Sequence, residues 1–88
     1  MPDVKQKEFN FIPAHSRAAR GLLDITQEQL AAAAGVDAET IRRFERGDQR
    51  PYQSTLAKIR EALERRGIEF TNGDSPGVRL RPEHSILQ

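Results

Sequence analysis

The stretch LAAAAGVDAETIRRFERG, residues 30–47, constrains the fold of this chain more strongly than any other part of the sequence. Alanine is the best helix former, and its short side chain lets two helices approach closely. Gly35 can take the left-handed conformation that ends a helix, and Asp37 is a favourable N-cap for the next one. We therefore expect two helices that are joined by a tight turn and pack directly against each other.

Capping residues predict the limits of these two helices. Thr26 and Gln29 have the spacing of a capping box, which predicts that the first helix covers Gln27–Ala34. The second is expected over about Ala38–Arg46, because Gly47 can end it.

Two further helices are expected on either side of this pair. A helix over about His15–Leu23 should end at Asp24, which tolerates the left-handed conformation better than most residues. Another should cover about Gln53–Arg66, where apolar residues recur at spacings of three and four. The buried stripe of that helix would consist of Leu56, Ile59 and Leu63.

Near the end of the chain, the pattern changes to one that alternates polar and apolar residues. Residues 68–71 and 78–81 alternate in this way around a run of turn-forming residues, which predicts a small β-hairpin. Two strands alone are marginally stable. We therefore expect Phe70 and Leu80 to cover the apolar stripe of the fourth helix or to form a subunit interface.

Composition excludes several classes of protein. The 88 residues allow one domain, and the absence of cysteine excludes disulfides and thiolate metal sites. No apolar run approaches the ~20 residues of a membrane span, and the start lacks a signal-peptide pattern, so we expect a cytoplasmic protein. His15 and His84 are far apart and are expected to be solvated rather than to bind metal. Since no catalytic constellation is present, we expect neither an enzyme nor a cofactor.

A helical wheel divides the predicted helix at residues 38–46 into two unlike sides. The net charge of the chain is only +1, so the placement of charges matters more than their sum. The arginines alone fit a solvated face as well as a binding face. One side of the wheel carries Ile41, Phe44 and Glu45, and the other carries Glu39, Arg42, Arg43 and Arg46.

The order of these features favours a helix-turn-helix, in which Ala31 lets the helices touch, Gly35 makes the turn and Ile41 locks the second helix in place. The stretches RGLLDITQEQLAAAAGV, DAETIRRFERGDQRP and STLAKIREAL resemble the helix-turn-helix domain of Cro and phage-repressor (XRE-type) regulators. The resemblance implies a mainly α, compact four-helix, lambda-repressor-like domain with a C-terminal β-hairpin. We expect a flexible N-terminal arm at 1–13 (with a short strand at 8–11 as the alternative), the DNA-binding domain at 14–67, a hairpin and candidate dimerisation element at 68–81, and a tail at 82–88.

The same resemblance implies roles for individual residues. Base edges would be contacted by Ala38, Glu39 and Arg43, where Arg43 suits guanine and Glu39 could accept from a cytosine amino group. Arg20 and Glu45 match a structural ion pair of the family. Phosphates would be contacted by Gln27, Thr40, Arg42, Arg46, Arg50 and Tyr52.

These features together predict a sequence-specific regulator that binds double-stranded DNA as a homodimer on an inverted repeat, with RNA polymerase as a conceivable protein partner. The helix at about 38–46 would be the recognition helix that enters the major groove. The two recognition helices of the dimer would then lie about one helical turn, roughly 34–36 Å, apart. A second hypothesis is an antitoxin-like module that binds a toxin and regulates its own operon. Its binding surfaces would be the hairpin and the apolar residues of the arm, namely Phe9, Phe11 and Ile12.

Overall fold

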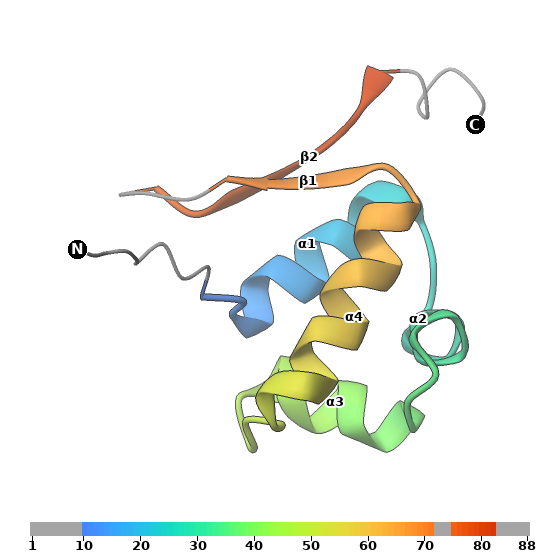
Figure 1. Cartoon of the computed structure of the whole chain (residues 1–88), viewed down its shortest axis with the longest axis vertical. Coiled ribbons are helices and arrows are strands. Elements are labelled where there is room, and N and C mark those ends of the chain that lie inside the picture. Colours follow the sequence, from blue (N-terminus) through green and yellow to red (C-terminus); the bar gives the residue numbers. More distant parts are fainter. Residues whose placement is uncertain (1–9, 72–74, 83–88) are drawn as a thin grey trace.

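The computed structural model describes residues 10–71 and 75–82. Four helices are followed by a two-stranded antiparallel hairpin, as the sequence predicts (Figure 1). Within the described residues, no helix is long and apolar enough to cross a membrane. The elements are α1 (Pro13–Leu23), α2 (Gln27–Ala34), α3 (Ala38–Arg46), α4 (Gln53–Arg65), β1 (Ile68–Thr71) and β2 (Gly77–Leu80).

The two central helices begin and end at the predicted residues. The Gln29 backbone N–H donates to Thr26 Oγ1 at 3.0 Å, and the Gln29 side chain accepts from the Thr26 backbone N–H at 2.9 Å, so the capping box is confirmed. Gly35 has a φ of 72° and ends α2, while Asp37 holds the N-cap position of α3 without a side-chain hydrogen bond. Asp24 is also left-handed, with a φ of 58°. The tight turn between α2 and α3 is therefore fixed by local backbone chemistry.

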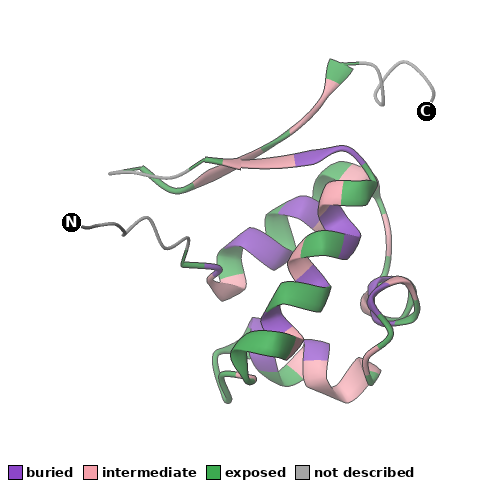
Figure 2. Cartoon of the chain, in the orientation of Figure 1, coloured by how far each residue is buried: buried purple, intermediate pink, exposed green. Residues whose placement is uncertain are grey.

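The core is built around α4 and the inner face of α3. The predicted stripe of Leu56, Ile59 and Leu63 is buried, and so are Ile41 and Phe44. Figure 2 shows buried residues on the sides of the helices that face one another and exposed residues on their outer sides. In Figure 1, α3 lies at the end of the molecule opposite the hairpin.

Phe11 and Pro13, which the sequence assigned to a flexible arm, belong to the folded domain. Phe11 is only 3% exposed and stacks on Phe44 with the ring centroids 5.5 Å apart, while Pro13 already belongs to α1. The Arg50 side chain donates to the Phe11 carbonyl oxygen at 3.1 Å, which also secures this segment. Asn10 and Phe11 are not in a strand, and the rest of the predicted strand lies outside the described residues.

The expectation that His15 is solvated is wrong. Its ring is buried, stacks on Phe11 at a centroid distance of 5.9 Å and meets Phe70 edge-on. His15 Nδ1 accepts a hydrogen bond from the Ile12 backbone N–H at 3.1 Å, so the side chain caps the start of α1. Burial lowers the pKa of His15 and thereby favours the neutral ring that this hydrogen bond requires. His84 lies outside the described residues.

The hairpin packs against α1 as well as against α4. Its register pairs Ile68 with Leu80 and Phe70 with Val78. β2 lies against α1, and β1 also meets α4. Phe70 contacts the ring of Phe11 at a centroid distance of 5.4 Å, so this side chain covers the start of α1 rather than only the stripe of α4.

Replacing Phe11 tests whether the segment before α1 belongs to the core. We expect Phe11→Ala to lower the free energy of unfolding by about 3 kcal/mol, because a buried aromatic ring leaves a cavity. Leu22→Ala is the control, because Leu22 of the neighbouring helix α1 is 44% exposed. Its effect should stay within about 1 kcal/mol. Equal losses in the two variants, measured by chemical denaturation, would contradict the assignment of Phe11 to the core.

Candidate nucleic-acid interface

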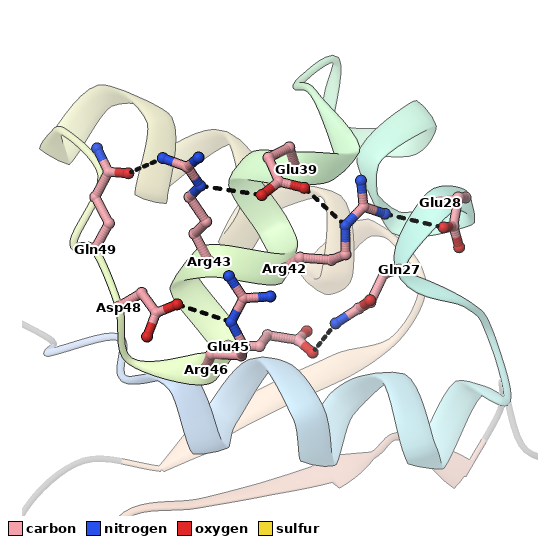
Figure 3. A network of polar contacts seen from close by, with 9 residues as sticks. All are labelled: Gln27, Glu28, Glu39, Arg42, Arg43, Glu45, Arg46, Asp48 and Gln49. Atoms are coloured by element: carbon pink, nitrogen blue, oxygen red, sulfur yellow. Dashed lines mark hydrogen bonds and ion pairs between the residues drawn. The ribbon is translucent and has the colours of Figure 1, made fainter.

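The helix α3 has one face fixed in the protein and one face open to solvent. Ile41 and Phe44 are 0% and 1% exposed and anchor the inner face. The side chains of Arg42, Arg43 and Arg46 are 37%, 53% and 56% exposed on the outer face. Figure 3 shows these three arginines extending from α3, with Arg42 directed toward Glu28 of α2. The amphipathic pattern of the sequence thus becomes a cationic ridge.

A buried carboxylate holds α3 in this orientation. Glu45 is 3% exposed, and Arg20 of α1 binds it with two hydrogen bonds, Nε to Oε2 at 2.9 Å and Nη2 to Oε1 at 2.7 Å. Ser16 donates to Oε2 at 2.6 Å, and the Arg17 side chain donates to the Glu45 carbonyl oxygen. The ion pair that the resemblance implied is therefore present, and Ser16 and Arg17 join it although no sequence pattern indicates them.

The ionised form of Glu45 is favoured despite its burial. Burial alone raises the pKa of this carboxyl, but the hydrogen bonds from Arg20, Ser16 and Gln27, together with the charge of Arg20, outweigh it. The net result is a pKa below the usual range of glutamate.

Gln27 links the start of α2 to this same carboxylate. Its Nε2 donates to Glu45 Oε1 at 3.1 Å, as drawn in Figure 3. An amide nitrogen carries two hydrogens, so a second one remains for another acceptor such as a phosphate. The residue therefore lies between the buried ion pair and the outer surface.

Acidic side chains accompany every arginine of the ridge. Glu39 accepts from Arg42 Nε at 2.9 Å through Oε1 and from Arg43 Nε at 3.0 Å through Oε2. Arg42 also meets Glu28 of α2 at 3.2 Å, and Arg46 meets Asp48 at 2.8 Å. The hydrogen bonds from Arg42 and Arg43 lower the pKa of Glu39, which keeps it ionised.

The other predicted contact residues are spread over different environments. Thr40 is half-buried on α3, and Ala38 is partly buried against the core. Tyr52 is 85% exposed. Arg50 is turned back onto the segment before α1, where it donates to Phe11 and to the Asn10 side chain at 3.2 Å.

A hollow beside the ridge contains residues that the sequence did not single out. It lies between the start of α3, the loop after α3 and the first turns of α4, and it has a volume of about 720 Å³. Lys58 adds a cation to it, and Gln49 reaches Arg43 Nη1 at 3.4 Å. The cluster of polar residues in DQRPYQST was the available signal. The new lining residues are Gln49, Thr55 and Lys58, and they join Glu39, Thr40, Arg43, Arg50 and Tyr52.

Comparison with protein-family models identifies a helix-turn-helix domain. A family model described as helix-turn-helix, of the Cro/C1 (XRE) type, matches residues 17–70, which is more than half of the chain. The match covers α1 from residue 17 onward, all of α2, α3 and α4, and most of β1. No curated protein matches the chain.

Removing Arg20 tests the buried ion pair. We expect Arg20→Ala to lower the free energy of unfolding by about 3 kcal/mol at neutral pH, because it leaves the Glu45 carboxylate buried without its counterion. The loss should shrink as the pH falls toward the ordinary glutamate pKa of 4.5. Between neutral pH and 4.5 the variant gains stability, because it protonates a carboxyl whose pKa burial now raises. Below 4.5 the wild type also loses the stability of its ionised Glu45, whose pKa in the folded protein lies below that value.

Arg79→Ala is the matched control for this variant. Arg79 pairs with Glu69 at 2.6 Å across the hairpin, but its side chain is 70% exposed. An exposed pair contributes about 0–1 kcal/mol. Thermal or chemical unfolding at several pH values measures both variants. A loss in Arg20→Ala that is small, or that does not change with pH, would contradict the role given to Arg20.

Proposed function

The chain belongs to the helix-turn-helix family of Cro/C1-type (XRE) DNA-binding regulators, and we propose that it recognises a specific double-stranded operator by placing α3 in the major groove. The observation that carries this proposal is the division of α3 into a buried face and a cationic ridge. The major groove of B-DNA is about 12 Å wide and admits one α-helix. A helix held by its inner face and charged on its outer face suits that groove.

Reading of bases is assigned to three residues of α3, namely Ala38, Glu39 and Arg43. Arg43, which is 53% exposed, is proposed to bind guanine O6 and N7 through its guanidinium group. Glu39 lies one turn earlier and would accept from a cytosine amino group, and Ala38 precedes it at the start of the helix. The half-buried position of Ala38 limits it to a contact with a group that approaches closely, such as a thymine methyl.

Phosphate contacts are assigned to the residues around this helix. Gln27 has an amide hydrogen to spare at the start of α2, where the helix N-terminus also favours an anion. The hollow beside α3 would take the backbone of one strand, and Lys58 and Thr55 supply donors there. The remaining proposed phosphate contacts are Thr40, Arg42, Arg46, Arg50 and Tyr52, of which Arg50 would first have to leave Phe11 and Asn10.

We further propose a homodimer on an inverted repeat, in which each subunit reads one half-site. Binding at or beside a promoter would then regulate transcription. The alternative, an antitoxin-like module, loses part of its expected surface because Phe11 is buried in the core. The hairpin remains as the surface through which such a module would bind a partner. RNA polymerase is the second candidate protein partner.

Footprinting of the DNA upstream of the gene tests the proposal directly. We expect two protected half-sites whose centres lie about one helical turn, roughly 34–36 Å, apart. Sedimentation of the protein–DNA complex should give two chains per site. Protection of a single half-site by one chain would contradict the homodimer. Absence of any protected sequence, together with tight binding to a neighbouring gene product, would favour the antitoxin-like alternative.

The variant Arg43→Ala tests base reading. It should weaken binding to the operator by about 1–3 kcal/mol and relax the preference at one base pair, because a bidentate contact is lost. Arg46→Ala is the control, since Arg46 is equally exposed but is assigned to phosphate. It should weaken all sequences alike and reduce the salt slope by about 1. Gel-shift titrations on operator and random duplexes measure both, and an equal loss for Arg43→Ala on the two duplexes would exclude base reading.

A further inference from the structure

Glu39 binds both arginines that flank it on the ridge. Its two carboxylate oxygens are each taken by a different guanidinium group, Arg42 at 2.9 Å and Arg43 at 3.0 Å. The Glu39 side chain is 43% exposed, so this clamp lies on the surface and not in the core (Figure 3). The packing of α3 against the other helices does not depend on this clamp.

In the free protein, the ridge has an acidic partner for each of its cations. Its three arginines face three acidic groups from three places in the chain, namely Glu28 on α2, Glu39 on α3 and Asp48 in the loop after α3. A surface that merely attracted phosphates would gain affinity by omitting these acids. Glu39 differs from the other two because it lies within α3 and contacts two arginines at once.

We propose that Glu39 is a specificity-determining residue that withholds Arg42 and Arg43 from the phosphates of non-cognate DNA and releases them at the operator. This inference rests on the proposed function, because it concerns the same helix in the same groove. The partner of Glu39 and its arginines is double-stranded DNA, and Glu39 is the group by which the chain rejects the wrong sequence.

The physical reason lies in what Glu39 meets when the clamp opens. At a non-cognate site, the freed carboxylate faces phosphates and base acceptors without a donor, and an unpaired charge of this kind penalises the wrong partner. At the operator, a guanine replaces Glu39 as the acceptor for Arg43, and a cytosine amino group replaces the arginines as the donor to Glu39. Both sides of the ion pair are then re-paired, so the operator alone avoids the penalty.

The variant Glu39→Gln tests the inference. It keeps the size of the side chain and removes its charge. We expect the affinity for a random-sequence duplex to rise by about tenfold, and the salt slope on that duplex to steepen by about 1–2, because one or two arginines become available to phosphates. The ratio of operator to random affinity should fall by about tenfold or more, since the contact to cytosine is lost as well.

Glu64→Gln is the matched control. Glu64 pairs with Arg60 at 3.2 Å and is 40% exposed, so the variant removes the same charge and a similar pair. It lies in the last turns of α4, which lead toward the hairpin and away from α3 (Figure 1). If Glu64→Gln raises random-duplex binding as much as Glu39→Gln does, net charge explains the gain and the inference is overturned.

A double-variant comparison checks that Glu39 acts through its arginines. In an Arg42→Gln, Arg43→Gln background, Glu39→Gln should no longer increase random-duplex binding. A gain that persists there overturns the inference. An unchanged operator preference in Glu39→Gln overturns it as well and leaves the proposed function intact. If the wild type itself prefers no duplex, the proposed function fails and this inference fails with it. Thermal unfolding of each variant verifies that the fold is kept.

Discussion

The buried carboxylate of Glu45 is the constraint on which the rest of the structure depends. It belongs to the helix that carries the cationic ridge, yet its hydrogen bonds come from Arg20 and Ser16 on α1 and from Gln27 on α2. One charged group therefore fixes three helices relative to one another. A purely apolar contact would bury area without defining rotation, because hydrophobic attraction has no preferred direction. The directed hydrogen bonds determine which side of α3 faces outward.

Local chemistry explains how much of the fold could be predicted from the sequence. The capping box at Thr26, the left-handed residues Asp24 and Gly35, and the spacing of the apolar residues in α4 act over a few residues, so each can be recognised in isolation. Phe11 and His15 were misjudged for the opposite reason. Their burial depends on Phe44 and Phe70, which are distant in the chain and belong to α3 and to the hairpin. A terminal segment with two prolines gives no local sign of such contacts.

The candidate interface could likewise be predicted only where the pattern is local. The helical period alone predicts which side chains of α3 point outward, and the structure has Arg42, Arg43 and Arg46 on that face. Their partners were not predictable, except for the attractive spacing of Glu39 and Arg43. Glu28 reaches Arg42 from another helix, while Gln49 of the loop after α3 and Lys58 of α4 line the same hollow as the start of α3. Contacts across elements require the tertiary arrangement, which a one-dimensional pattern does not contain.

The position of Tyr52 has a consequence for spectroscopy. The chain contains one tyrosine and no tryptophan, so near-ultraviolet emission arises mainly from this phenol. Because the ring is 85% exposed and borders the hollow next to α3, it is already in water in the native state. Its fluorescence should therefore change little when the domain unfolds, but should respond when nucleic acid is bound nearby. The fluorescence of Tyr52 thus serves as an intrinsic signal of nucleic-acid binding that changes little when the protein unfolds.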